Sequence, residues 1–493
     1  MKKKETRWVV TAIVLLLCCL VAKSQVAAKK NYAESLFTLG EIASVDIMMP
    51  DSTWQVIIEH AHEKKYHVCS VTINGEQFDS VAIRTKGASS LDDVKTMNSD
   101  RYSFTLKLNK YRKGQKYHGM TKLLLNNNIW DATQMKDAVV YDMCRYIGLP
   151  APLTNYARIS LNDKYFGCYL IVEAVDKNFC KRNYPGENTK IYKPYHNLAY
   201  TGDDLKLYGD IANFAKVRGD ETSMQRVVAA LRSVDEGKDI DEHVDVESVM
   251  KYMALQTIVV NYDCMTGKNT QNYYLREADG KISLIPWDYN LAWGGYPDDE
   301  GDFEGFGDFD PEKWKDWFDS LSQEQRDSMQ QAFSQQQWID VPMTESSWSK
   351  EDVSKIVNFP IDTPFTSKLT KRTFFMNLLA NEAYKARYYH YLKVLCNKYI
   401  KGGGFQRTIN TINKEIGTFV GTEHNAFYSN KRFHKAMQTF NTLLQKRAAS
   451  VLSQINGEIP ATWDAQKAEP EKLINSDDIN LSDLGWLMVI EKK

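Results

Sequence analysis

The sequence predicts an α/β protein of the α+β kind, in which a mostly antiparallel N-terminal sheet is followed by a largely helical C-terminal part. The dipeptide Asn74-Gly75 separates two alternating runs, HVCSVTI and EQFDSVAIRTKG, and this is the strongest short-range signal for a β-hairpin. In the last third of the chain, apolar residues recur at helical spacing around 321–337, 367–400 and 404–455. We therefore expect strands first and helices last.

The earlier elements follow from similar patterns. An apolar run from residue 42 predicts a strand, and a helix is expected over 51–62. The run YSFTLKLN over 102–109 alternates with period two, so Lys107 should point away from the apolar face. Further expected elements are a helix over 131–147, two strands within 156–176, a helix over 246–260 and a hairpin over 270–288.

Composition excludes several classes of protein. With 493 residues, 43% hydrophobic and 25% charged, the chain resembles neither a disordered nor a collagenous sequence. Lys and Arg (62) nearly balance Asp and Glu (63), which leaves a net charge of −1. Because no overall positive field would attract nucleic acid, we expect no nucleic-acid partner.

The N-terminus has the pattern of a secretory signal peptide. Four basic residues within the first seven positions precede an apolar run over 8–22, and small residues follow it. This run is shorter than the roughly 20 residues that a membrane span needs. We expect residues 1–28 to be removed, leaving a secreted, periplasmic or cell-surface protein with no stable membrane span. The alternative is an uncleaved N-terminal anchor.

The remaining chain is expected to divide into four parts. These are a sheet-rich N-terminal lobe, an insertion with a catalytic or metal-binding segment, a helical region and a polar, loose tail, at 37–180, 181–310, 311–457 and 458–493. Six scattered cysteines follow the signal segment without a C-x-x-C pair, so we expect most of them to be small core residues.

Oxygen-bearing side chains gather in the second part. Asp263 follows the predicted helix, Asn269 and Asn272 come next, and Asp288 ends the predicted hairpin. Carboxylate and amide oxygens suit a hard cation such as Mg²⁺. The alternative is that each aspartate merely caps a turn.

Six segments together resemble the CotH kinase family, which is named for a spore coat protein and is related in fold to protein kinases. They are RTKGASS (84–90), FTLKL (104–108), DATQMKDAVVYDMCRYIGLPAP (131–152), ISLNDKYFGCYLIVEAVDKNF (159–179), NYDCMTGKNTQNYYL (261–275) and IPWDYNLAWGGY (285–296). The resemblance implies a two-lobed, protein-kinase-like fold in a bacterial protein. It also implies transfer of the γ-phosphoryl group of ATP, with Mg²⁺ or Mn²⁺, to a protein acceptor outside the cytoplasm.

The resemblance also implies roles for residues of the sheet. In a phosphate-covering loop, Arg84, Gly87 and Ser89 would approach the nucleotide, and Lys107 would bind phosphate. Glu173 would fix the linker near the adenine or bind a ribose hydroxyl. The alternatives are a plain hairpin end for the loop and a solvated strand face for Lys107. The acidic partner of the lysine would be Asp137 or Asp142 on the following helix.

In the second part, the resemblance makes Asp263 the general base, Asp288 the principal metal ligand, and Asn272 or Asn269 a further ligand. Asn290 stands where many members carry a second aspartate; it offers a carbonyl oxygen without charge.

Three other readings stay open. The acidic stretch 298–310 is either a solvated loop that selects basic substrates or a Ca²⁺ site. The fold could serve a non-catalytic, pseudokinase-like surface assembly or binding protein. More distantly, the same carboxylates suit a metal-dependent hydrolase.

Overall fold

The computed structural model of the chain describes residues 31–194, 198–209, 219–267, 270–295, 322, 348–365 and 373–485. The expected signal segment, the acidic stretch 298–310 and, apart from residue 322, the helical pattern at 321–337 lie outside these residues. Within them, no helix combines the length and the apolar character that a membrane span requires.

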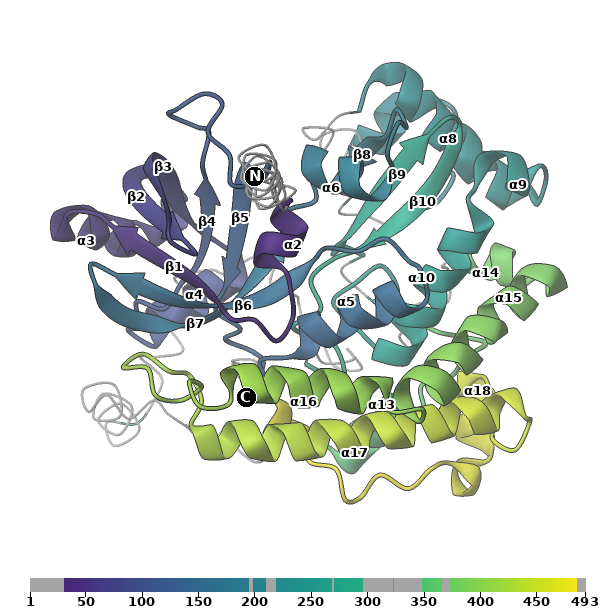
Figure 1. The fold of residues 1–493 in the computed structure, drawn as a ribbon. Coiled ribbons are helices and arrows are strands. Elements are labelled where there is room, and N and C mark those ends of the chain that lie inside the picture. Colours follow the sequence, from purple (N-terminus) through teal and green to yellow (C-terminus); the bar gives the residue numbers. More distant parts are fainter. Residues whose placement is uncertain are drawn as a thin grey trace, which may run out of the picture.

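Seven strands of the N-terminal part form a closed barrel, at the left of Figure 1, in the order β1-β2-β3-β4-β5-β7-β6. Their bounds are β1 Ala43–Met48, β2 His67–Ile73, β3 Glu76–Lys86, β4 Ser103–Lys107, β5 Lys122–Asn126, β6 Thr154–Leu161 and β7 Lys164–Glu173. The predicted β2–β3 hairpin is confirmed, and the positive φ angles of Asn74 (47°) and Gly75 (85°) fit a type I′ turn.

The closure of the barrel is a feature that the sequence did not predict. Strand β1 pairs antiparallel with β2 and parallel with β6, where Ala43 lies opposite Ala157. Short helices α2 (Tyr32–Leu36), α3 (Asp51–Glu59) and α4 (Ser89–Thr96) accompany the strands. Periodicity reveals single strands, but it does not reveal which distant strands pair.

A three-stranded antiparallel sheet, in the order β10-β9-β8, lies on the other side of the molecule (Figure 1). It consists of β8 (Lys190–Tyr192), β9 (Tyr273–Ala278) and β10 (Lys281–Pro286), and the predicted β9–β10 hairpin is confirmed. The helices of this part are α6 Lys177–Asn183, α8 Glu221–Glu236, α9 Ile240–His243 and α10 Val246–Val259. The segment that begins at residue 181, which was expected to be an insertion, therefore supplies a strand of this sheet and a 16-residue helix.

Helix α5 (Lys136–Tyr146) begins later than predicted. The side chain of Asp131 accepts hydrogen bonds from the backbone N–H groups of Thr133 and Lys136, and Gln134 has a φ of 57°. These contacts form an irregular turn ahead of the helix, because Asp side chains favour local bonds to the backbone over helix interiors.

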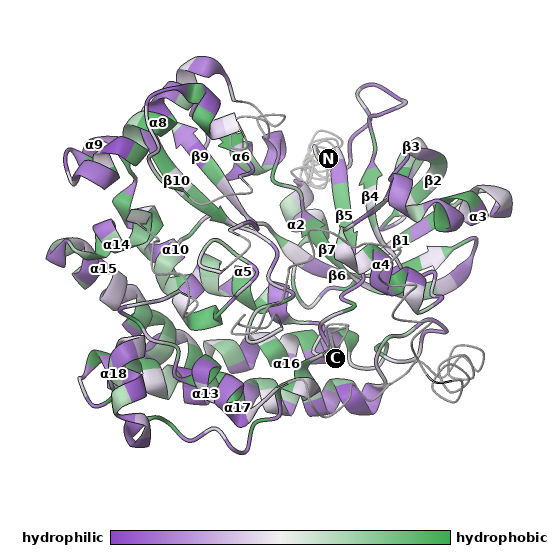
Figure 2. Cartoon of the chain, turned by 180° about the vertical axis from the view of Figure 1, so that it is seen from behind, coloured by the Kyte–Doolittle hydropathy of each residue, from purple (hydrophilic) through white to green (hydrophobic). Residues whose placement is uncertain are grey.

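The described C-terminal residues are mainly helical, as predicted. The bounds are α13 Lys350–Val357, α14 Thr373–Leu379, α15 Glu382–Lys393, the π-helical η4 Val394–Ile400, α16 Gly404–Ile416, α17 Asn430–Ile455 and α18 Trp463–Ala468. Figure 2 shows hydrophobic residues along β5 and β10 and hydrophilic ones on α9 and α17. The six described cysteines are buried and free of disulfides.

The prediction of a loose C-terminal tail is wrong for residues 458–485. This segment contains α18, and Ile479, Leu481 and Leu484 are 6%, 3% and 2% exposed. A largely polar segment can still dock when a few apolar side chains reach the core.

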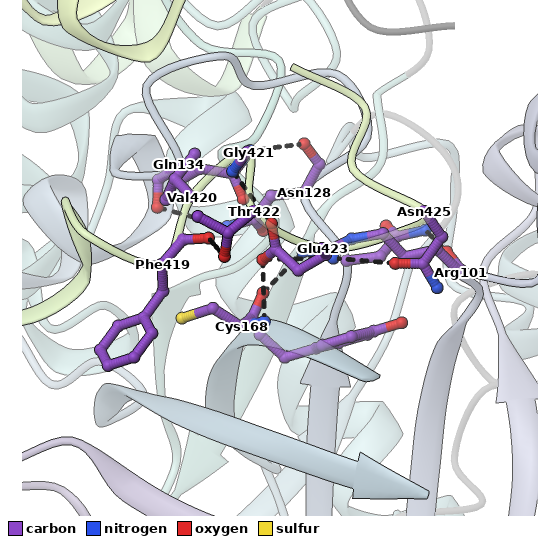
Figure 3. Close-up of polar contacts among 12 residues, drawn as sticks. Arg101, Asn128, Gln134, Cys168, Phe419, Val420, Gly421, Thr422, Glu423 and Asn425 are labelled. Atoms are coloured by element: carbon purple, nitrogen blue, oxygen red, sulfur yellow. Dashed lines mark hydrogen bonds and ion pairs between the residues drawn. The ribbon is translucent and has the colours of Figure 1, made fainter. Parts of the chain in front are cut away.

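A buried ion pair joins the barrel to the loop 417–429 between α16 and α17 (Figure 3). Arg101 and Glu423 lie 3.4 Å apart with side chains 5% and 2% exposed. Arg101 donates to the carbonyl oxygen of Cys168 at 2.7 Å, and the Cys168 N–H donates to Glu423 at 3.0 Å. Because removal of either partner would leave a buried charge uncompensated, this contact fixes the helical region on the barrel.

A second buried arginine fixes the end of α10. Arg447 of α17 is 0% exposed and donates to the carbonyl oxygens of Thr257 (2.8 Å) and Val357 (3.1 Å). These carbonyls belong to the last turns of α10 and α13, where a helix leaves acceptors unpaired and favours a cation. The chain leaving α10 therefore starts from a firmly held position.

Candidate active site

The chain after α10 brings Asp263 and Asn272 together. The Asn272 side chain donates to the Asp263 carboxylate and to its backbone carbonyl, both at 2.8 Å. Gln271 donates to the other carboxylate oxygen at 3.1 Å. A Cβ at Gly267 would lie 1.6 Å from the Tyr262 carbonyl oxygen, so only glycine fits this turn.

Asp288 follows β10 and rests on α5. Its backbone N–H donates to the Tyr141 hydroxyl at 3.1 Å, and the N–H of Tyr289 donates to the Asp137 carboxylate at 2.7 Å. Asp137 is only 3% exposed. Helix α5 thus holds the segment that carries Asp288 through two backbone contacts.

Asn261 connects the two aspartate segments. Its side-chain oxygen accepts from the N–H of Asp263 at 3.1 Å, and its amide donates to the carbonyl oxygen of Asp288 at 3.4 Å. Asn261 is 1% exposed, so water cannot easily replace these bonds. It is a positioning residue shared by both aspartates.

The backbone around these residues is locally strained. Val260, Asn272, Asp288 and Trp293 have φ angles of 43°, 60°, 63° and 52°. A positive φ is uncommon outside glycine, and for a β-branched residue such as Val260 it is a genuine outlier. Such strain persists where the surrounding structure over-determines it, and it clusters at functional sites.

Lys86, the last residue of β3, supplies the positive charge of the site. Its ammonium group donates to the Asn126 side-chain oxygen at 2.5 Å. Burial lowers the pKa of Lys86, whereas the negative charges of Asp288 and Asp137 raise it. Burial raises the pKa of Asp137 above its ordinary value, and the nearby charge of Asp288 raises it further.

Lys193, just after β8, adds a second positive charge. Burial lowers its pKa and the charge of Asp288 raises it, which puts Lys193 within electrostatic reach of the same carboxylate. We name the group Lys86, Asn126, Asp137, Lys193 and Asp288 the mixed-charge cluster. It contains side chains from the barrel, from α5 and from the segments that follow β8 and β10.

The structure does not bring Lys107 to this cluster. Lys107 ends β4 opposite Ala82 and Lys122, whereas Lys86 lies opposite Ser103 at the other end of the strand. Burial does not alternate along β4 as the sequence pattern predicted: Phe104 and Leu106 are 2% and 0% exposed, but Ser103 and Thr105 on the other face are also buried, at 7% and 4%. Lys86, a lysine in the electrostatic field of Asp288, therefore comes from the RTKGASS segment and not from the following strand.

The segment 84–90 is also built differently from the expected loop. Arg84 lies within β3 with its guanidinium 5.0 Å from the centre of the Tyr66 ring, and Ser89 is the first residue of α4. Gly87 links them with a φ of 122°, which a residue with a side chain rarely adopts. A strand end and a helix start thus take the place of a covering loop.

Glu173 is the last residue of β7, opposite Leu123 of β5, so it directly precedes the linker that begins at residue 174. It is 2% exposed and accepts hydrogen bonds from Arg182, from the hydroxyl of Tyr32 and from the N–H of Leu153. Since this chain already engages both carboxylate oxygens, Glu173 holds the linker in position.

Of the two aspartates expected to pair with Lys107, Asp137 lies in the electrostatic field of Lys86 instead. Asp142 instead accepts from the hydroxyls of Tyr399 (2.7 Å) and Thr408 (2.6 Å) in the C-terminal helices. Asn290 lies half-buried two residues after Asp288, and Asn269 lies outside the described residues.

Sequence reasoning missed Lys86, Lys193, Asn126 and Asn261 as site residues. Lys86 stood within a quoted motif, and Asn261 directly follows the predicted helix, so both lay in segments already singled out. For Lys193 and Asn126 no local signal exists, because only the tertiary fold carries them to Asp288.

Residue types that suit a hard cation are present in these segments, as carboxylate and amide oxygens. Throughout the part of the chain that the structure describes, no three His, Cys, Asp or Glu side chains gather closely enough to hold a metal. Asp288, Asn272 and Asn290 offer oxygen atoms only. Mg²⁺ commonly binds through one or two carboxylates and fills its remaining positions with water and phosphate oxygens.

Comparison with known proteins identifies the family of the chain. The family described as CotH kinase protein matches residues 83–451 of the chain. Inner spore coat protein H of Bacillus subtilis (strain 168) is 23% identical over 190 residues, which cover 36% of this chain. The matched stretch spans about half (51%) of that relative's length. The extent of the family match, from the end of the barrel's third strand to the last turns of α17, shows that the chain belongs to the CotH kinase family.

Proposed function

We propose that this protein is an atypical kinase that transfers the γ-phosphoryl group of ATP, with Mg²⁺ or Mn²⁺, to a hydroxyl group of a protein acceptor. The observation that carries the proposal is the mixed-charge cluster, where Lys86 and Asp137 flank Asp288. Positioning and charge neutralisation account for most of the catalysis of phosphoryl transfer, and this cluster offers both.

A two-lobed, kinase-like arrangement is part of the same proposal. The barrel would form one lobe, and the second sheet with the helices would form the other. In support, Lys86 and Asn126 come from the barrel, whereas Asp263, Asn272 and Asp288 come from segments beyond the linker. A nucleotide between the lobes would meet residues from both.

In the proposed reaction the acceptor oxygen forms a bond to the γ-phosphorus atom as the bond from that phosphorus to the bridging oxygen breaks. ADP leaves, and the hydroxyl proton passes to the Asp263 carboxylate. Asn272 and Gln271 hold that carboxylate by direct hydrogen bonds. Their contacts fix its direction, which matters because a misplacement of about 1 Å can cost roughly 100-fold in rate.

Lys86 replaces Lys107 as the proposed phosphate-binding lysine. Its ammonium group is oriented by Asn126 and lies in the field of Asp137 and Asp288. Lys193 would share the task of neutralising phosphate oxygens from the opposite wall.

Asp288, Asn272, Asn290 and, outside the described residues, Asn269 would hold the divalent cation. When bound, such a cation neutralises phosphate charge and orients the phosphate oxygens. Glu173 would keep the linker between the two proposed lobes in place.

We also propose that the protein acts outside the cytoplasm, at the cell surface or in a comparable compartment. The signal-like N-terminal pattern supports this, and so does the relative named as an inner spore coat protein. The same relative, together with Asn290 at the position of a second aspartate, favours a non-catalytic surface-assembly protein as the second candidate.

One experiment separates the two candidates. The purified full chain is incubated with γ-labelled ATP and Mn²⁺ or Mg²⁺, and labelled phosphate is scored on the chain itself and on a generic acceptor protein. A kinase transfers label, loses transfer in Asp263→Asn and Asp288→Asn, and is stabilised thermally by ATP with metal. Folded protein that neither transfers label nor gains stability would contradict the kinase and favour the assembly protein.

A further inference from the structure

A pocket of about 870 Å³ lies away from the mixed-charge cluster, where α2, the β4–β5 connection and the start of α6 meet. This volume is in the range of sites that hold small molecules. None of Lys86, Asp137, Asp263 and Asp288 is part of its lining.

The pocket is lined by an unusual excess of positive charge. Its walls carry five lysines, Lys107, Lys116, Lys122, Lys177 and Lys181. Within the described residues, none of these five forms an ion pair within 4.0 Å of a carboxylate.

The remaining charged groups of the lining are already engaged. Arg182 pairs with Glu173 and His118 with Glu76. The carboxylate of Asp176 accepts from the N–H of Asn178 at 2.8 Å at the start of α6. The lining therefore holds five lysines against one carboxylate, that of Asp176.

This crowding affects Lys122 most directly. Burial lowers the pKa of Lys122 from its ordinary value; Asp176 partly offsets this, and the positive charges of Lys107 and Arg84 lower the pKa further. An anion bound in the pocket would offset the repulsion among these positive groups. The loss of this repulsion would therefore favour anion binding.

The chemistry of the lining favours phosphate. Each ammonium group is a compact charge with three donors on a flexible stem, whereas planar, bidentate recognition of carboxylates is the work of arginine. The single arginine here is committed to Glu173. A pocket with several lysines suits a ligand with several phosphate groups better than a ligand with a single phosphate group.

We propose that this lysine pocket binds a ligand that carries two or more phosphate groups, at a site separate from the ATP–metal site. The strand register supports the separation. Lys86 and Lys107 lie on the same face of the sheet but four residues apart along β4, roughly 13 Å. This binding does not depend on the proposed kinase activity.

Two sources share this chemistry, namely a free oligophosphate and a multiply phosphorylated segment of a protein. The probes are inorganic tripolyphosphate and a doubly phosphorylated serine peptide, with its unphosphorylated form as a blank. Binding to the full chain is measured by calorimetry in EDTA, so that metal-dependent binding at Asp288 is suppressed.

The variant Lys116→Glu/Lys181→Glu reverses two charges of the pocket. Its control, Lys113→Glu/Lys431→Glu, makes the same change at exposed positions outside the lining, one of them on the same connection. Both variants are checked for unchanged thermal unfolding. We expect at least tenfold weaker binding in the pocket variant only, unchanged binding in Asp288→Asn, and weaker binding at high salt because salt screens the charges.

Each outcome is decisive. Tighter binding of tripolyphosphate identifies the ligand as a free oligophosphate, and tighter binding of the phosphopeptide identifies it as a phosphorylated segment. Absence of binding by both probes overturns the proposal. Equal loss in the two double variants, or loss in Asp288→Asn with the pocket variant unaffected, overturns it as well, because the anion would then bind elsewhere.

Discussion

The two ends of the face formed by β3, β4 and β5 differ in the balance of positive and negative side chains. At one end, Lys86 meets Asn126, Asp137 and Asp288, so positive and negative groups are balanced. At the other end, Lys107 and Lys122 lie opposite each other and join three more lysines around a pocket. The same strands therefore present two different sites.

The difference shows what each end can do. A balanced cluster of oriented groups is stable without a ligand and provides a fixed field for a reaction, as preorganised catalytic sites do. An unbalanced cluster is costly until an anion arrives, so it is suited to binding. We assign catalysis to the mixed-charge cluster and anion binding to the lysine pocket.

The largest expected effect is at Asp288. Asp288→Asn removes the charge but keeps a residue that tolerates the positive φ of 63°, and we expect phosphoryl transfer to fall by about 10²–10³-fold or more. Asp279→Asn is the matched control, since Asp279 precedes the other end of β10 with a φ of 50°. The rates of phosphoryl transfer of the two variants are compared. Similar losses in both would contradict the assignment of Asp288 as the metal ligand.

Lys86 and Lys107 test which end of β4 contacts the nucleotide. We expect Lys86→Met to lower transfer by roughly 100-fold, because it removes the charge that neutralises phosphate oxygens. Lys107→Met should lower it by less than about tenfold, since the register separates it from Asp288. The measurement is the initial rate of phosphoryl transfer at saturating ATP. A larger loss in Lys107→Met than in Lys86→Met would show that Lys107 is the lysine that contacts the phosphates.

Asn261 should show a smaller effect, on positioning. Asn261→Ala removes its bonds to Asp263 and Asp288, and we expect about a tenfold loss of kcat with little change in the KM for ATP. Asn381→Ala, which removes the N-cap of α15 at a cost of about 1 kcal/mol, is the control for general destabilisation. Activity that follows stability equally in both variants would argue against a positioning role.

The smallest effect concerns the stability of the lysine pocket. The folded-state pKa of Lys122 is lowered from 10.5, so the unfolded chain binds more protons in the window just below pH 10.5, and stability rises with pH there. Lys122→Met removes this penalty. We expect it to gain up to about 1 kcal/mol at pH 7 and less near pH 10. The free energy of unfolding is measured in urea at both pH values, with the exposed Lys113→Met as the control. An equal gain in stability in Lys113→Met would contradict an electrostatic cost in the pocket.

Much of the local structure could be predicted from the sequence. The Asn74-Gly75 hairpin depends on neighbouring residues, and it is present. The pairing of Asp263 with Asn272 also came from nearby residues, nine positions apart.

The choice between Lys86 and Lys107 could not be predicted. Alternation indicates only that Lys107 faces away from the apolar side, and every second residue along a strand shares that property. Which end of β4 approaches Asp288 depends on the closure of the barrel and on the packing of α5, and both involve contacts between distant segments. For the same reason, neither Lys193 nor the lysine pocket had a local signal.

The most direct test of this assignment is thermal stabilisation by ATP with Mn²⁺, measured for the full chain, for Asp288→Asn and for Lys116→Glu/Lys181→Glu. We expect stabilisation of the wild-type chain to be lost in Asp288→Asn and to be retained in the pocket variant. Retention in Asp288→Asn together with loss in the pocket variant would contradict the account, because the nucleotide would then bind at the lysine end.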